Sequence, residues 1–228
     1  TKDNYLWIGT YSGLVKFEGT EFEVFNTENT PELGSNSIVS LCEQGETLWI
    51  GTPIGITRFS NNKFIRKHEL SKLNRFNISL IKTDSENNLW IFTVAHGVWK
   101  FDGKVLVEFE KAKEFRSPVK SFAEDKYGRI CIGTETGELY VFQDGSFVQE
   151  LSEKNTGGIL NLISLRNYKV LVSTSIGVFD IFAQEGIKKY APLAKHDKIT
   201  YLLEDKHENI WFGNREGLFR YRQNTQEI

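Results

Sequence analysis

A twelve-residue segment recurs almost unchanged along this chain. LWIGTYSGLVKF starts at Leu6, and LWIGTPIGITRF starts at Leu48. Four looser copies start at Leu89, Ile130, Val170 and Ile210. The intervals between successive starts are 42, 41, 41, 40 and 40 residues. A fixed period of roughly 20 to 50 residues is typical of a repeat architecture, so this spacing constrains the fold more than composition does.

Each repeat unit reads as four short strands. An apolar strand such as SIVSLCE or ISLIKTD leads through a polar turn into the LWIGT strand. A loop ending in glycine, a third strand such as GLVKF, a tight turn and a fourth strand such as FEVF follow. Apolar and polar residues alternate in these segments, and none shows a sustained helical period with caps. The pattern predicts an all-β fold, a β-propeller of four-stranded antiparallel blades.

We expect a single β-propeller region over residues 1–228. Its six repeat units of 40–42 residues cover about 1–30, 31–70, 71–112, 113–152, 153–192 and 193–228. The first unit lacks its first strand and the last lacks a clear fourth strand. We therefore expect an incomplete ring or a part of a larger propeller, with a six-bladed ring with imperfect ends as the alternative. The start TKDNYLWIG, without Met, suggests a piece of a larger protein.

Aromatic residues recur at two positions of the repeat. A residue that builds the scaffold recurs in every blade, whereas a residue of a catalytic or binding site is needed only once in the chain. We therefore expect these residues to fill the layer between blades rather than to bind a ligand. The second-strand tryptophans are Trp7, Trp49, Trp90 and Trp211, and the third strand ends in Phe17, Phe59, Phe101, Phe142, Phe182 or Tyr221.

Glycine closes the loop before the third strand in every unit, which predicts a positive φ or a close backbone approach there. These glycines are Gly13, Gly55, Gly97, Gly137, Gly177 and Gly217.

Composition narrows the function classes. The net charge of −2 argues against a nucleic-acid partner, and no run of eighteen apolar residues is present to span a membrane. Cys42 and Cys131 lie in strand-like apolar runs without metal-ligand spacing, so we expect two buried thiols and no metal or other cofactor.

The pattern E-D-x-x-G-x-L-W-I-G-T-x-x-G-L-x-x-F resembles the two-component regulator propeller repeat. It is fullest at ETLWIGTPIGITRF and also appears as AEDKYGRICIGTETGELYVF and LEDKHENIWFGNREGLFRY. The resemblance implies the periplasmic input region of a membrane-anchored hybrid sensor kinase, often built from two seven-bladed rings. Many members of the family recognise oligosaccharides. Units three and five depart from the pattern, with Phe92 and Ser173 at the glycine position.

Residues in loops that vary between the copies are the candidates for ligand binding, because the scaffold does not require them. Aromatic and arginine side chains suit sugar stacking and carboxylate pairing. The candidates are Tyr11, Arg75, Phe76, His96, Phe115, Arg116, His196 and Arg215.

We expect a non-catalytic, extracytoplasmic sensor domain of a two-component signalling protein. Its partner would be a small-molecule ligand such as a glycan or another protein, and it would form a homodimer through the parent protein. The alternative is a protein-interaction scaffold. A propeller lyase is the third reading, in which His96 and His196 act with Glu135 or Asp197 as an acid–base pair.

Overall fold

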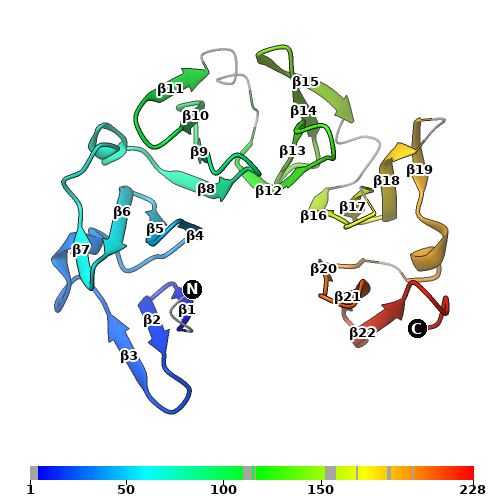
Figure 1. Cartoon of the computed structure of the whole chain (residues 1–228), viewed down its shortest axis with the longest axis horizontal. Helices are drawn as coiled ribbons and strands as arrows, with labels where there is room; N and C mark the ends of the chain where they lie inside the picture. The colour runs from blue at the N-terminus through cyan, green and yellow to red at the C-terminus, as the bar shows by residue number, and fades with distance from the viewer. Residues whose placement is uncertain are drawn as a thin grey trace. The chain divides into compact units, whose positions relative to one another are not determined.

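The computed structural model describes residues 5–109, 115, 117–151, 158–167, 169–183, 186–196 and 198–228. Within these residues, every sheet is antiparallel and its strands follow in chain order (Figure 1). Four sheets have four strands and two have three. The predicted all-β propeller is therefore confirmed, with six blades in the described part of the chain. The chain divides into two compact units, Thr1–Pro118 and Val119–Ile228, and each is described by itself.

Unit 1 contains blades 1 to 3. Blade 1 comprises β1 (Leu6–Thr10), β2 (Gly13–Phe17) and β3 (Phe22–Phe25). Blade 2 comprises β4 (Ser40–Gln44), β5 (Thr47–Thr52), β6 (Gly55–Ser60) and β7 (Lys63–Ile65). Blade 3 comprises β8 (Ile78–Thr83), β9 (Leu89–Thr93), β10 (Val98–Phe101) and β11 (Leu106–Phe109).

Unit 2 contains blades 4 to 6. Blade 4 comprises β12 (Val119–Glu124), β13 (Ile130–Thr134), β14 (Leu139–Gln143) and β15 (Ser146–Leu151). Blade 5 comprises β16 (Ile159–Ser164), β17 (Val170–Thr174), β18 (Gly177–Ala183) and β19 (Gly186–Lys189). Blade 6 comprises β20 (Tyr201–Glu204), β21 (Asn209–Asn214) and β22 (Gly217–Arg222).

The loop glycines have the backbone conformation that the repeat predicts. All six have positive φ, from 78° at Gly97 to 149° at Gly217. At Gly55 a Cβ would also lie 2.5 Å from the Asn74 Cα, so two independent constraints exclude other residues there.

The glycine inside the second strand marks the closest approach between successive blades. A Cβ on Gly51 would lie 2.8 Å from Ile78 Cγ2 of blade 3, and a Cβ on Gly9 would lie 2.8 Å from Ile38 Cγ2, just before blade 2. At Gly133 the same distance to Ile159 Cγ2 of blade 5 is 2.5 Å. Because glycine has no side chain, the isoleucine of the next blade can pack against the backbone at this position.

Each blade has two distinct faces. In blades 1 and 2 the front face carries the repeat tryptophan and the strand glycine, and the rear face carries the neighbouring Leu and Ile and the aromatic that ends the third strand. Trp7 on the front of blade 1 packs on Phe59 on the rear of blade 2, with ring centroids 4.9 Å apart. Trp49 of blade 2 packs likewise on Phe101 of blade 3, at 6.4 Å. These four repeat aromatics of unit 1 thus lie in the layers between blades.

A side-chain acceptor near the end of the first strand holds the repeat tryptophan in three blades. Trp90 Nε1 donates to Asp84 and Trp211 Nε1 to Asp205, both at 2.8 Å, and Trp49 Nε1 donates to Gln44 at 3.0 Å. Hydrogen bonds from Asn209 and Trp211 hold the pKa of Asp205 well below its usual range. The acidic turns that follow the first strands therefore have a structural role.

In the described part of the chain, three connections between blades contain a short 3₁₀ turn with one fully buried leucine. The turns are η1 (Pro31–Leu33), η2 (Ser71–Leu73) and η4 (Ala191–Leu193). Their last residues, Leu33, Leu73 and Leu193, are each 0 % exposed. Each leucine belongs to the apolar cluster between the two blades that its turn connects, so it fixes the path of the connection.

Candidate functional site

Three aromatic side chains from two loops and a strand of unit 1 form a stack. The Phe76 ring lies parallel to the His96 ring, with centroids 4.4 Å apart and an interplanar angle of 15°. The Trp99 ring lies 6.1 Å from Phe76 at 29°. We call Phe76, His96 and Trp99 the blade 3 platform. It is the candidate ligand site because two predicted residues, Phe76 and His96, meet there.

The backbone around the platform is fixed on both sides. On the η2 side, the Phe76 amide donates to the Leu73 carbonyl at 3.0 Å, which places Phe76 directly beyond the buried leucine. On the other side, the Val94 amide donates to the Asn77 carbonyl at 2.7 Å and ties the β9–β10 loop to this connection. The Trp99 indole N–H donates to the His96 carbonyl at 3.2 Å.

The loop that carries His96 departs from the repeat. It has one residue more before its glycine than the YSG and PIG loops, and Ala95 takes a positive φ of 66°. A non-glycine residue with positive φ is uncommon, and such outliers cluster at functional positions. In this loop the exposed imidazole of His96 lies on the Phe76 ring.

Polar groups surround the stack. His96 Nδ1 is 3.0 Å from the Val94 carbonyl and must donate to it, so the neutral ring keeps its proton on Nδ1. Its Nε2 has no partner among the described residues and is available as an acceptor. Lys72 Nζ lies 4.5 Å from the Trp99 ring centroid. Arg75 is exposed and forms no ion pair with another described residue. Of the three rings His96 is exposed, Phe76 is half-buried and Trp99 is 5 % exposed. The His96 ring can therefore stack on a flat or apolar ring, and the basic side chains can pair with an anionic group.

Unit 2 has a comparable cluster at the matching place of the repeat. His196 follows the buried Leu193 by three residues, as Phe76 follows Leu73. Its ring lies 4.9 Å from Phe212 and 5.3 Å from Phe219, which itself occupies the repeat position of Trp99. His196 is half-buried, so this cluster exposes less ring surface than the blade 3 platform.

The other predicted ligand residues lie in other loops and connections. Tyr11 is 88 % exposed in the β1–β2 loop, and Arg215 is exposed in the β21–β22 loop. Phe115 is half-buried in the connection between blades 3 and 4, and Arg116 lies outside the described residues.

Sequence reasoning missed Trp99 and Lys72. The signal for Trp99 was present, because GVWKF has tryptophan where other units have GLVKF or GITRF. Lys72 carries no such signal, since a lysine in a polar connection is ordinary, and only its place over the Trp99 ring makes it notable.

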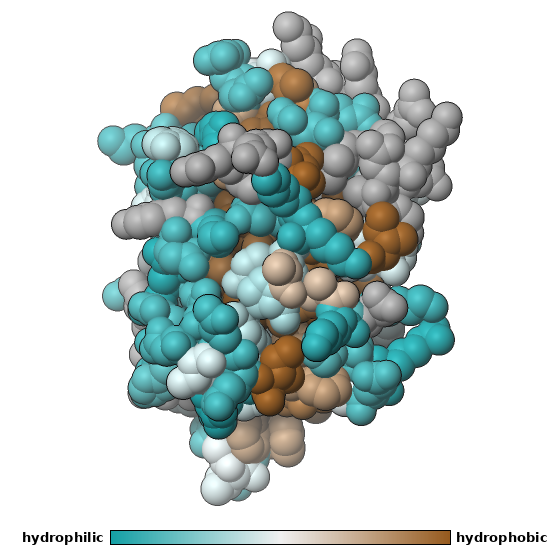
Figure 2. Space-filling model, turned by 90° about the vertical axis from the view of Figure 1, so that its right-hand side faces the viewer, coloured by the Kyte–Doolittle hydropathy of each residue, from teal (hydrophilic) through white to brown (hydrophobic). Residues whose placement is uncertain are grey.

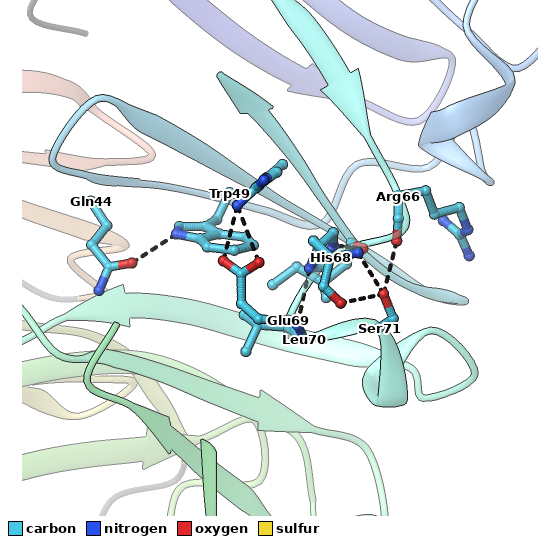
Figure 3. A network of polar contacts seen from close by, with 9 residues as sticks. Gln44, Trp49, Arg66, His68, Glu69, Leu70 and Ser71 are labelled. Carbon is cyan, nitrogen blue, oxygen red and sulfur yellow. Dashed lines mark hydrogen bonds and ion pairs between the residues drawn. The ribbon is translucent and has the colours of Figure 1, made fainter. Parts of the chain in front are cut away.

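A separate polar network joins blade 2 to η2 (Figure 3). His68 Nε2 donates to the Ile56 carbonyl and Nδ1 accepts from the Leu70 amide, each at 3.1 Å. Ser71 accepts from the His68 amide at 2.7 Å. Arg58 donates to both oxygens of Glu69. Because both ring nitrogens of His68 bind backbone, this histidine holds the fold and offers nothing to a ligand.

The acid–base arrangement of the lyase reading is not assembled within either unit. His96 belongs to unit 1 and His196 to unit 2. The Glu135 carboxylate lies 3.6 Å from Lys120 Nζ, with which it forms an ion pair. Asp197 lies outside the described residues. No three His, Cys, Asp or Glu side chains gather to hold a metal in the part of the chain that the structure describes.

The fold and the repeated inter-blade contacts define the chain as a β-propeller. Residues 32–53 match the family model of the two component regulator propeller, so this segment is such a repeat and the resemblance is confirmed. The whole chain is 26 % identical, over 258 residues, to histidine kinase P4 of Formosa agariphila, of which it spans 19 %.

Solved structures share the fold. The extracellular domain of a hybrid two component system from B. thetaiotaomicron matches 97 % of this chain with a TM-score of 0.77 and 23 % identity, and the chain spans 32 % of that domain. Virginiamycin B lyase from Staphylococcus aureus matches 98 % with a TM-score of 0.70 and 10 % identity, and the chain spans 79 % of it. Among the described residues, no helix has the length and apolar character to cross a bilayer.

Proposed function

We propose that this chain is a non-catalytic, ligand-binding propeller region of an extracytoplasmic two-component sensor. The observation that carries the proposal is the similarity along its full length to a histidine kinase. The two-component regulator repeat at 32–53 and the fold shared with an extracellular domain of a hybrid system support the same reading. Ligand binding would shift the arrangement of domains or subunits and thereby change the activity of a kinase.

We infer that the ligand is an oligosaccharide and that the blade 3 platform contacts it. The outer face of His96 is exposed beside Phe76, and pyranose rings present an apolar face of C–H groups that suits an aromatic surface. Lys72 and Arg75 add positive charge beside it, which favours a carboxylated sugar over a neutral one. His96 Nε2 can accept a hydrogen bond from a sugar hydroxyl.

Titration calorimetry of the full chain with neutral and uronic-acid oligosaccharides tests this proposal. We expect heat of binding with at least one acidic oligosaccharide. His96→Ala and Arg75→Ala should each weaken binding by about tenfold, which corresponds to roughly 1.4 kcal/mol. Tyr11→Ala is the matched control, because Tyr11 is an exposed aromatic in the corresponding loop of blade 1 and should leave the affinity unchanged.

The protein-interaction scaffold remains the competing function. Binding of no oligosaccharide in the panel, together with a normal melting temperature, would favour the scaffold. Equal loss of affinity in His96→Ala and Tyr11→Ala would still support a ligand-binding sensor but would contradict a ligand site on blade 3. Release of a cleaved or eliminated product from any oligosaccharide would instead support the lyase.

A further inference from the structure

The blade 3 platform has a counterpart in unit 2 at the same place of the repeat. In unit 1, Arg75 and Phe76 lie two and three positions after the buried leucine of η2. In unit 2, Lys195 and His196 lie two and three positions after the buried leucine of η4. The connection through η1 has serine and asparagine at these positions. The scaffold therefore does not require a basic residue followed by a ring, and yet two connections have this pair.

An aromatic residue of the third strand completes each arrangement. Trp99 and Phe219 occupy equivalent positions, opposite Ile91 and Phe212 of the second strand. The Phe212 and Phe219 rings stack 5.2 Å apart at 16°. The His196 ring lies 4.9 Å from the first and 5.3 Å from the second, so it packs on both phenyl rings.

Packing between two described blades holds these rings in place. Phe212 is 1 % exposed and shares one apolar cluster with Leu193 and with Tyr190 at the end of blade 5, and Phe219 packs against this cluster. The side of the molecule that carries blades 5 and 6 faces the viewer in Figure 2, where apolar groups lie among a mostly hydrophilic surface. Apolar and polar groups are thus available side by side on this side of unit 2.

His196 leaves both of its ring nitrogens unbonded. His68 binds backbone groups through both nitrogens, and His96 binds one through Nδ1. The His196 ring forms no hydrogen bond with any described residue, although this residue is half-buried. A polar group that packing partly shields from water gains from a bonding partner. The imidazole therefore has a donor and an acceptor to offer to a ligand.

Positive charge flanks the His196 ring along the chain. Lys195 and Lys198 are exposed, and neither forms an ion pair with a described residue. Asp197, between His196 and Lys198, lies outside the described residues. An exposed ammonium group without a counter-charge can pair with a carboxylate. Unit 2 thus has the basic group, the imidazole and the aromatic ring that the blade 3 platform also has.

We propose that Lys195, His196 and Phe219 form a second site for an acidic sugar, which we call the blade 6 site. The sugar carboxylate would pair with Lys195, a hydroxyl would bond a ring nitrogen of His196, and the half-buried Phe219 would contact the apolar C–H face. The inference rests on the proposed function, because it assigns the same class of ligand to unit 2. Each unit would then bind a short acidic sugar by itself.

Imidazole NMR spectra of the full chain test the proposal, because the four histidines have different surroundings. Disaccharides of galacturonic, glucuronic and mannuronic acid are titrated at constant pH, and single His→Gln variants assign the signals. At least one disaccharide should give saturable shifts at His96 and His196. His68, which binds backbone through both nitrogens, and His207, in the β20–β21 turn, should not respond.

A repeated dipeptide provides the matched control. Lys195–His196 and Lys206–His207 have the same sequence, and both lysines are exposed. Lys195→Gln should weaken the response of His196 by about tenfold and leave that of His96 unchanged. Lys206→Gln should change neither response. Both substitutions replace an exposed side chain, so both variants should fold.

The outcomes separate the blade 6 site from the proposed function. Shifts at His96 alone would overturn the blade 6 site and leave the blade 3 platform supported, whereas shifts at none of the four histidines would overturn both sites. Shifts at His196 alone would support the blade 6 site and contradict the blade 3 platform. A Lys195→Gln chain that responds as wild type does, or shifts at His207 equal to those at His196, would indicate general attraction of the acidic sugar and would also overturn the blade 6 site.

Discussion

Trp90 donates its indole N–H to Asp84, six residues earlier in the chain, across 2.8 Å. Trp49 and Trp211 have comparable acceptors in Gln44 and Asp205. Trp7, in the same position of blade 1, has a buried Nε1 with no hydrogen-bond partner among the described residues. Four tryptophans that look equivalent in the repeat are therefore not equivalent in energy, because an unpaired buried donor is destabilising.

Replacing tryptophan by phenylalanine should separate the two cases. Trp90→Phe removes the donor to Asp84, whereas Trp7→Phe removes a donor that has no partner among the described residues. Trp90 is 1 % exposed and Trp7 is half-buried, so Trp90→Phe loses more buried ring contact as well as the hydrogen bond. It should lower the free energy of unfolding by about 1–3 kcal/mol more than Trp7→Phe. Urea denaturation measures the difference, and equal losses would show that the hydrogen bond to Asp84 contributes nothing.

Adding one methyl group to the strand glycine should have opposite effects in blades 2 and 6. Gly51→Ala pushes a Cβ to 2.8 Å from Ile78 Cγ2, and such overpacking costs about 1–3 kcal/mol. A Cβ on Gly213 meets nothing within 4 Å, so Gly213→Ala should gain about 0.5–1 kcal/mol from reduced backbone freedom. Thermal unfolding in dilute solution gives both signs, and destabilisation by both changes would refute the spacing argument.

His68 should make folding sensitive to acid. Burial lowers its pKa, while Arg58, Arg66, Glu69 and the Ile56 carbonyl are the charged and polar groups around it. Protonation therefore favours the unfolded chain, in which the pKa is about 6.5. The contribution of the neutral ring is complete above about pH 6.5 and is lost as the pH falls toward the lower native pKa.

Urea midpoints measured from neutral to acidic pH test this dependence. His68→Gln should flatten the decline below about pH 6.5, where the wild-type chain loses stability. His207→Gln, which replaces an exposed histidine, is the control for the loss of an imidazole. A decline of the same slope in wild type and His68→Gln would assign the acid sensitivity to other groups.

Neither thiol should react in the folded protein. Cys42 and Cys131 are buried, and burial raises both pKa values, that of Cys131 to about 12. Because the thiolate is the reactive form, a neutral disulfide reagent should label neither residue until urea unfolds the chain, and then both. Rapid labelling of one thiol under native conditions would reveal local opening of its blade.

The repeat was sufficient to predict the blades because one pattern specifies both strand and interface. LWIGT places Trp and Gly on one face and Leu and Ile on the other, so the same residues that form the strand also bury it. The loop glycines add the turn conformation. The different environments of Trp7 and Trp90 could not be read this way, since the acceptor comes from the preceding strand and varies between Asp and Gln.

The blade 3 platform was only half predictable. Phe76 and His96 stood out as loop residues, but they are twenty positions apart on different elements, and their stacking depends on Leu73 and on the strained Ala95. A rule now visible across the repeats would help. The residue three positions after the buried connection leucine is Asn36, Phe76 or His196, and in two of these three connections it is a ring that stacks on other aromatic side chains.

Because Gly51 has no side chain, Ile78 of blade 3 packs directly on its backbone, and this contact sets the distance between the two sheets. Gly9 and Gly133 make the same kind of contact with Ile38 and Ile159. Between blades 5 and 6 the position belongs to Ser173, and Asn161 of blade 5 accepts a 3.0 Å hydrogen bond from the Leu202 amide of blade 6. Ser40 of blade 2 accepts an equivalent bond of 2.9 Å from the Ile81 amide of blade 3. The polar link between neighbouring blades thus survives the loss of the glycine, so the hydrogen bond and the steric contact are separate means of holding two blades together.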